Sequence, residues 1–211
     1  MDNDLYSQLS EKMVQLQILS RGISDSKVLE AMRKVPRHLF VPEGLIELAY
    51  LDCALPTSNG QTISQPYIVA YMTERLQLKM SDRVLEIGTG TGYQTAILSE
   101  ASSCVVTVER IPELYQSAKV RLESLGYDNV TCILGNGYEG FAPEAPYDKI
   151  IVTAAAPFIP DALIRQLSPN GRMIIPVGSG SQELILVTKD ENGELKEEKD
   201  LSVIFVPLVE K

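Results

Sequence analysis

The sequence predicts an α/β fold in which helices cover both faces of a doubly wound, mainly parallel sheet. The chain has 211 residues, of which 45% are hydrophobic and 22% charged, the composition of a globular domain. From Asp82 onward, short apolar runs alternate with stretches of helical periodicity, a pattern typical of βαβ units. Three glycines, Gly88, Gly90 and Gly92, stand where the first of these runs meets a helix. A ligand can approach the backbone closely at such a turn.

The first eighty residues are expected to form a helical cap and a polar loop. Apolar residues recur at spacings of three and four from Leu5 to Leu19, which predicts an amphipathic helix that Gly22 ends. A shorter apolar stripe ends at Pro36, and a polar loop precedes a helix over residues 66–78. We therefore expect one domain over 1–211, with residues 1–80 as cap and substrate loop and 81–211 as the α/β core. The cap either covers the carboxyl edge of the sheet or lies beside it.

The core is expected to contain five parallel strands and an antiparallel C-terminal pair. The parallel strands are predicted over residues 83–87, 104–108, 130–134, 147–153 and 171–177. Helices are predicted between them, one of which begins at Pro112. Asn192-Gly193 reads as a tight turn between a strand over 183–189 and a last strand over 201–208.

Net charge and cysteine spacing indicate which ligands and which cellular compartment to expect. With 19 basic and 28 acidic residues the net charge is −9, which opposes contact with a phosphate backbone. Cys53, Cys104 and Cys132 lack metal-ligand spacing and read as small buried residues in a reducing compartment. The chain starts with acidic residues and contains no apolar run long enough to span a membrane. We expect a cytoplasmic monomer that binds no metal, nucleic acid or membrane.

The glycine cluster does not have the dinucleotide-binding spacing, because Tyr93 and Thr95 occupy the positions of the third glycine. Glu86, just before the cluster, would repel a pyrophosphate. It suits a ligand with positive charge, such as the amino and sulfonium groups of S-adenosylmethionine. Glu109 ends the second strand, where an acid commonly binds ribose hydroxyls. The alternative is an ordinary strand-to-helix turn with incidental acids.

The loop over residues 60–66 carries hydroxyl groups and permits two interpretations. Ser64 can cap the helix that follows, with Pro66 in its first turn. Thr62 and Ser64 can also face a substrate at the carboxyl edge of the sheet. His38 is the sole histidine and no GxSxG motif occurs, so nothing favours a Ser–His or Cys–His mechanism. We interpret His38 as part of a packed turn.

The chain resembles the protein-L-isoaspartate O-methyltransferase family along nearly its whole length. The glycine motif is common to many methyltransferases. The loop over 60–66, the Val-Thr-Ala-Ala stretch over 152–155 and the Phe-Val-Pro-Leu ending over 205–208 are specific to the family. Further matching stretches are 21–23, 28–37, 40–42, 49–52, 84–94, 108–110 and 175–178.

The resemblance implies the Rossmann-like fold of class I S-adenosylmethionine-dependent methyltransferases, with an unusual order of the last strands. It also implies methyl transfer to the free α-carboxylate of L-isoaspartyl residues, and weakly of D-aspartyl residues, in damaged proteins. The products are S-adenosylhomocysteine and an ester that closes to a succinimide, which begins repair. A carboxylate is already ionised at pH 7, so positioning and desolvation suffice without a strong base. Two alternatives remain: another methyl acceptor, such as a small molecule or RNA, and a non-catalytic module that binds the cofactor.

The resemblance further assigns roles to individual residues. It implies Ser64 as the catalytic serine, with Thr62 and Gln182 also binding the substrate. Asn136 stands where the family usually has an aspartate that accepts the adenine amino proton, so we expect weaker cofactor binding. The approach to the loop, Leu-Pro-Thr-Ser-Asn over 55–59, also departs from the family pattern. The implied cofactor-binding residues are Thr62, Ile63, Gln65, Glu86, Gly88, Gly90, Glu109, Arg110, Asn136 and Gly137.

Overall fold

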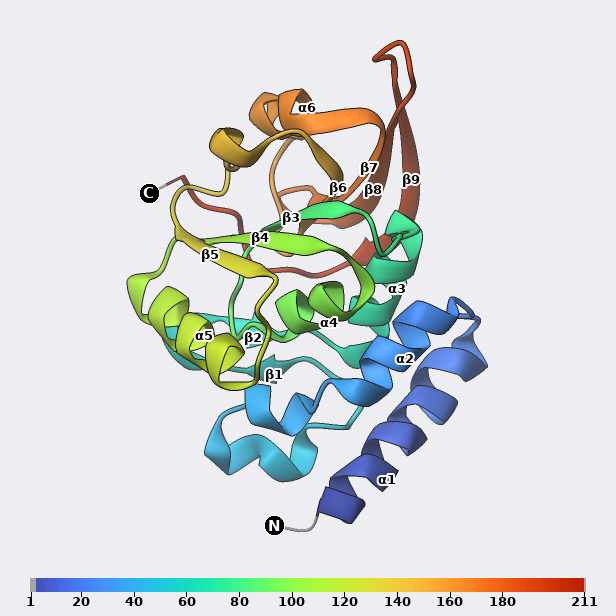
Figure 1. Cartoon of the computed structure of the whole chain (residues 1–211), viewed down its shortest axis with the longest axis vertical. Helices are drawn as coiled ribbons and strands as arrows, with labels where there is room; N and C mark the ends of the chain where they lie inside the picture. Colours follow the sequence, from blue (N-terminus) through green and yellow to red (C-terminus); the bar gives the residue numbers. More distant parts are fainter. Residues whose placement is uncertain (1–2, 211) are drawn as a thin grey trace.

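The computed structural model describes residues 3–210 and contains a seven-stranded sheet with helices on both faces (Figure 1). Met1, Asp2 and Lys211, at the two ends of the expected domain, lie outside the described residues. The sheet order is β5-β4-β3-β6-β7-β8-β9. The strands are β3 (Arg83–Ile87), β4 (Cys104–Glu109), β5 (Val130–Leu134), β6 (Tyr147–Val152), β7 (Leu167–Val177), β8 (Gln182–Lys189) and β9 (Leu195–Val203).

Strand directions confirm the doubly wound, mainly parallel sheet with an antiparallel C-terminal edge. Strands β5, β4, β3, β6 and β7 pair in parallel, whereas β8 pairs antiparallel with both β7 and β9. The last three strands follow one another in chain order at this edge. A separate two-stranded sheet pairs β1 (Leu55–Pro56) with β2 (Thr62–Ile63). The chain order reverses beside β3, so the loops at the carboxyl ends of β3 and β6 leave space for a ligand.

Helices cover the two faces of the sheet unequally. Helices α3 (Pro66–Leu76), α4 (Tyr93–Ala101) and α5 (Pro112–Ser124) lie on one face, and α6 (Asp161–Gln166) lies on the other (Figure 1). Leu76 and Leu98 pack against Val84 on the first face. On the opposite face Leu163 packs with Ile150. These faces are apolar because both sides of a parallel sheet are buried. Short helical turns span Arg37–Phe40, Glu43–Leu48, Ser58–Gly60 and Ala142–Glu144.

The N-terminal cap lies beside the sheet. Helix α1 (Asn3–Met13) continues as a π-helical turn over Val14–Ile18 and a 3-10 turn over Leu19–Arg21, and Gly22 ends it with φ +96°. Helix α2 (Ser26–Lys34) begins after Asp25, whose side chain accepts two backbone N–H bonds. Residues of α1 and α2 share an apolar cluster with residues of α3 and α4. The cap therefore packs on the helical layer, and only the loop after it reaches the carboxyl edge of the sheet.

Three expectations are corrected by the structure. Strand β7 begins at Leu167 rather than at residue 171. The last strand spans Leu195–Val203 rather than 201–208. The hairpin turn fixes the register Lys189↔Leu195, so the charged residues after it, which remain solvated at the sheet edge, form the strand. Cys53 is exposed rather than buried, and Cys104 and Cys132 are half-buried; all three are free thiols. No helix in the described part of the chain has the length and apolar content needed to cross a membrane.

Candidate active site

The glycine turn after β3 is held closely against the end of β6. Gly88, Gly90 and Gly92 all have positive φ, at +99°, +54° and +89°, a conformation that favours glycine. A Cβ atom on Gly88 would collide with the hydroxyl oxygen of Thr153. That hydroxyl donates to the carbonyls of Ile87 at 3.0 Å and Gly88 at 2.7 Å. The backbone of the turn is thereby fixed before any ligand binds.

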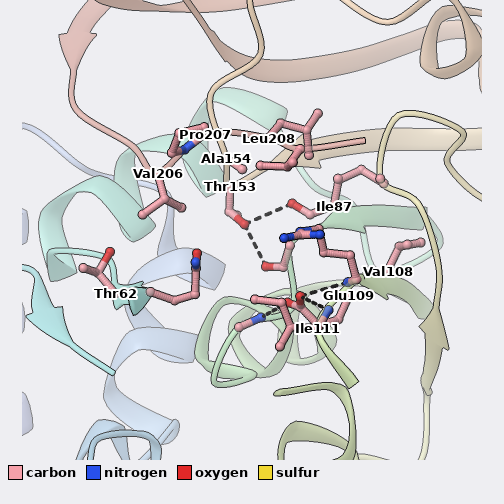
Figure 2. Close-up of a pocket in the computed structure, with 16 residues that line it drawn as sticks. Thr62, Ile87, Val108, Glu109, Ile111, Thr153, Ala154, Val206, Pro207 and Leu208 are labelled. Carbon is pink, nitrogen blue, oxygen red and sulfur yellow. Dashed lines mark hydrogen bonds between the residues drawn. The ribbon is translucent and has the colours of Figure 1, made fainter. Parts of the chain in front are cut away.

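A pocket opens above this turn, at the carboxyl ends of β3, β4 and β6 (Figure 2). We call it the first pocket. Six of the ten expected cofactor-binding residues line it, together with Thr153, Ala154 and the C-terminal residues 206–209, which the sequence analysis did not assign. The six are Thr62, Gly88, Gly90, Glu109, Arg110 and Gly137.

Glu109 is the fixed negative charge of the first pocket. Its Oε1 accepts the backbone N–H groups of Arg110 and Ile111, and its Oε2 accepts that of Gly90, each at 2.9 Å. Oε1 accepts two N–H groups and Oε2 only one, so a lone pair of Oε2 remains available for a hydroxyl donor. Three backbone donors hold the carboxylate in one orientation at the end of β4, where an acid commonly binds ribose hydroxyls.

Glu86 lies beneath the glycine turn and is not among the residues that line the first pocket. The side chain is fully buried, and its Oε2 accepts the hydroxyls of Thr95 at 2.5 Å and Thr107 at 2.7 Å. Its Oε1 has no hydrogen-bond partner. Burial raises the pKa of Glu86 from 4.5 to about 8, against the opposing effect of the two hydroxyls. Glu86 is therefore protonated in much of the population at neutral pH and supports the turn from below.

A second pocket adjoins the first, and Thr62 lines both. Ser64 and Gln65 line it from the loop, and residues 202–205 line it from the C-terminal side. Helix α3 has Gln65 as its N-cap residue, with no side-chain capping bond. The interpretation of Ser64 as a helix cap is therefore wrong: the helix begins at Pro66 as expected, and the cap position falls on Gln65.

Arg37 is a site residue that the sequence analysis did not single out. It is fully buried, and its guanidinium donates to the carbonyls of Ala49 and Ser64, each at 2.7 Å. The guanidinium carbon lies 4.6 Å from the ring centre of Tyr93, and Nη1 has no partner. Burial lowers the pKa of Arg37. No local pattern in the sequence marks this arginine, and only the tertiary structure shows that it holds the backbone of Ser64.

Three other expected site residues have side chains engaged with the protein itself. Asn136 accepts the N–H of Tyr138 at 3.0 Å and donates to Glu139 at 3.1 Å, and it is not among the residues lining the first pocket. Gln65 donates to the carbonyl of Asp52 at 3.1 Å. Ile63 is buried below the loop, where it lines a small cavity together with residues of the glycine turn.

Gln182 and His38 are not among the residues that line the two pockets. Both ends of the Gln182 carboxamide bond to the main chain of Phe205, and the residue is not among those lining the second pocket. His38 stacks on Tyr6 with a centroid separation of 3.8 Å, and its Nδ1 lies 2.7 Å from the hydroxyl of Tyr50. Burial lowers the pKa of His38. The packed turn expected around this histidine is what the structure contains.

Comparison with known proteins decides the family. The family model of protein-L-isoaspartate(D-aspartate) O-methyltransferase matches residues 8–211. The chain belongs to this family. It is 54% identical over 201 residues to protein-L-isoaspartate O-methyltransferase 2 of Pelobacter propionicus, covering 94% of this chain and 89% of that protein. It is also 54% identical over 203 residues to protein-L-isoaspartate O-methyltransferase 2 of Archaeoglobus fulgidus, with coverage of 95% and 90%.

Solved structures of the protein-L-isoaspartate O-methyltransferase family have the same fold as this chain. One structure of a protein-L-isoaspartate O-methyltransferase superimposes with a TM-score of 0.86 at 31% identity. The match covers 94% of this chain and 65% of that longer chain. Another, a protein-L-isoaspartate O-methyltransferase from Plasmodium falciparum in complex with S-adenosyl-L-homocysteine, gives a TM-score of 0.82 at 28% identity, with coverage of 98% and 99%. The activity of this chain is the S-adenosylmethionine-dependent methylation of L-isoaspartyl residues.

Proposed function

We propose that the two pockets divide the methyl transfer between them, the first binding S-adenosylmethionine and the second binding the isoaspartyl residue. The observation that carries this proposal is their junction: Thr62 lines both pockets, and Ser64 lines the second one two residues further along the same loop. Two ligands seated there meet at the loop, which satisfies the requirement that the reacting atoms be held in contact.

The residues of the first pocket fit the cofactor. Gly88 and Gly90 present backbone without side chains, so the methionine part can lie against the turn. Glu109 offers a fixed carboxylate to the ribose hydroxyls. Glu86 acts through the turn rather than by contact, because its side chain is buried below it. When bound, S-adenosylmethionine supplies an activated methyl group.

The residues of the second pocket orient the acceptor. The isoaspartyl α-carboxylate has an ordinary pKa near 4 and is ionised at pH 7, so its oxygen attacks the methyl carbon without a base. As the O–CH3 bond forms, the S–CH3 bond breaks and its electron pair stays on sulfur. The hydroxyls of Ser64 and Thr62 donate to a carboxylate oxygen and fix its direction of attack. Arg37 holds the carbonyl of Ser64 and so keeps the loop in place.

The neighbouring backbone amide nitrogen attacks the ester carbonyl, loses its proton and expels methanol, which closes a succinimide. Water then opens the ring and returns part of the residue to normal aspartate. We extend the proposal to D-aspartyl residues as poorer acceptors, because they present a carboxylate in a less favourable direction. An L-isoaspartyl peptide and its D-aspartyl counterpart, compared at equal concentration, should differ in kcat/KM in favour of the first. Equal values would remove this part of the proposal.

The test uses methyl-labelled S-adenosylmethionine and two peptides that differ only in isoaspartyl or aspartyl linkage. We expect label on the isoaspartyl peptide alone. Ser64→Ala should lower kcat/KM for that peptide by about 10²-fold, the usual effect of removing one directed donor, and leave cofactor affinity unchanged. Ser58→Ala, in the same loop but outside both pockets, is the matched control. Full activity of Ser64→Ala would show that the serine hydroxyl is dispensable.

We also propose that residues 1–211 act as a single-domain monomer in the cytoplasm, with 1–80 as cap and substrate loop. The apolar cluster that joins α1 and α2 to α3 and α4 supports one folding unit. The free thiols support a reducing compartment. Light scattering should give the chain mass of 23.3 kDa. Twice that mass would refute the monomer, and two separate unfolding transitions would refute the single unit.

A further inference from the structure

The C-terminal segment, residues 204–209, forms a wall shared by both pockets. Ile204 and Phe205 line the second pocket, directly after the end of β9. Residues 206–209 continue along the first pocket, where Figure 2 shows Val206, Pro207 and Leu208 beside Thr153 and Ala154. The position of this one segment therefore sets the width of two binding sites that must meet for transfer.

The far end of the C-terminal segment is fixed to the chain that follows β6. The N–H of Ala155 donates to the carbonyl of Val206 at 2.8 Å, and the N–H of Leu208 donates to the carbonyl of Ala155 at 2.7 Å. Leu208 also packs on the apolar cluster of that face of the sheet. These contacts hold residues 206–208 but do not reach Phe205.

At the near end the main chain of Phe205 is hydrogen-bonded by Gln182, while its side chain packs on the apolar cluster that contains Leu76. Nε2 of Gln182 donates to the carbonyl of Phe205 at 3.0 Å, and Oε1 of Gln182 accepts the N–H of Phe205 at 2.6 Å. The β8–β9 ladder has its last pair at Gln182↔Val203, so the main chain of Phe205 lies just beyond the sheet. The carboxamide makes the pair of bonds that a neighbouring strand would have made. The carboxamide supplies the donor and the acceptor on two separate atoms.

The loop before Gln182 places this side chain. Gly178 has φ +138°, and a Cβ there would meet the carbonyl oxygen of Ser181. The N–H of Gly178 donates to the carbonyl of Ala156 at 2.9 Å, one residue beyond the anchor of the far end. The loop that carries Gln182 and the residues that hold the far end of the C-terminal segment are therefore hydrogen-bonded to each other.

We propose that Gln182 is a positioning residue for methyl transfer, whose carboxamide holds the C-terminal segment in the place that both ligands require. The proposal rests on the assignment of the two pockets made above. It replaces the expectation that Gln182 contacts the substrate. Without the two bonds, the segment keeps its attachment at Ala155 and the packing of the Phe205 side chain, but its main chain at Phe205 is no longer held in one position. Each ligand then binds only the fraction of molecules whose wall is in place, which raises its apparent dissociation constant.

The experiment compares Gln182→Ala and Gln182→Glu with the parent protein. We expect Gln182→Ala to raise the dissociation constant of S-adenosylhomocysteine and the KM of the isoaspartyl peptide by about tenfold each, as two neutral hydrogen bonds are lost. At saturation kcat should stay within about twofold, because the loop with Ser64 is unchanged. Gln182→Glu keeps the acceptor and loses the donor, so its effects should be intermediate. If Gln182→Ala does not fold, the binding constants of Gln182→Glu test the positioning role of Gln182.

A second readout reports on the segment without any turnover. Amide hydrogen exchange should become faster in residues 204–209 of Gln182→Ala and stay unchanged in β8 and β6. The matched control is Glu183→Gln, at the residue that follows Gln182 in the chain. This change removes an exposed ion pair with Lys199 and should alter neither the dissociation constant of S-adenosylhomocysteine nor the KM of the peptide. A raised KM for the peptide alone, with unchanged cofactor affinity and exchange, would overturn the proposal in favour of direct substrate contact. A parent protein that methylates no isoaspartyl peptide would instead refute the proposed function, while exchange and S-adenosylhomocysteine binding would still test Gln182.

Discussion

Replacing Glu86 by glutamine removes a buried titratable group while keeping its shape. Glu86 is fully buried with one unpartnered oxygen, and burial raises its pKa from 4.5 to about 8. The folded state therefore holds a proton that the unfolded state releases across this range. Below pH 4.5 Glu86 is protonated in both the folded and the unfolded state, so its ionisation does not lower the free energy of unfolding. As the pH rises toward 8, only the unfolded chain gains the benefit of ionising, so stability falls.

The size of the effect follows from the shift. Each pKa unit corresponds to about 1.4 kcal/mol, so a shift from 4.5 to about 8 amounts to about 5 kcal/mol in full. About 4 kcal/mol of this is expected between pH 5 and pH 8. In Glu86→Gln this dependence is absent, because an amide does not ionise. The introduced amide can still accept the hydroxyls of Thr95 and Thr107 through its oxygen.

Urea unfolding of both proteins, without cofactor, at intervals from pH 5 to pH 9 measures the difference in unfolding free energy. Other titrating groups are common to both proteins and cancel. We expect Glu86→Gln to gain stability relative to the parent as pH rises, with the difference levelling off above pH 8. A difference that is independent of pH would refute the reasoning, since it would mean that Glu86 has the same charge in both states. A difference of opposite slope would show that the folded state stabilises the carboxylate.

Three further changes test other parts of the site. Asn136→Asp should bind S-adenosylhomocysteine about fivefold more tightly by calorimetry, as a charge-assisted hydrogen bond is stronger than a neutral one; equal affinities would dismiss the expected weakness. Gly137→Ala would place a Cβ 2.5 Å from the side chain of Ile87, and a loss of about 1–3 kcal/mol in thermal unfolding is expected; an unchanged Tm would contradict the packing. Arg37→Met leaves two carbonyls unpaired and should lower the free energy of unfolding in urea by about 3 kcal/mol. Arg33→Met, which removes only a surface ion pair of a half-exposed side chain, should cost under about 1 kcal/mol; similar losses would argue against the role of Arg37.

The sequence predicted well the elements that depend on local interactions and predicted poorly those that depend on contacts distant in the chain. Alternation of apolar runs and helical stripes predicted the parallel strands β3 to β6 within a residue of their ends, because each is determined by local periodicity. The last strand was misplaced by six residues at its start, since charged residues at a sheet edge carry no apolar signal. The start of α3 at Pro66 was predicted correctly, but its N-cap is Gln65, so the interpretation of the Ser64 hydroxyl as a cap was wrong.

By itself the sequence determined the fold class, the glycine turn with Glu109 beyond it, the hydroxyl loop and, through its resemblance, the family. These features lie within single segments, where spacing and residue type carry the information. Only the tertiary structure decided that Glu86 lies below the turn, that Arg37 holds the backbone of Ser64, and that Gln182 engages Phe205 instead of facing the second pocket. Each of these depends on which buried polar atoms meet across long separations in the chain. A desolvated donor or acceptor must find a partner wherever packing brings one, and no local pattern records that choice.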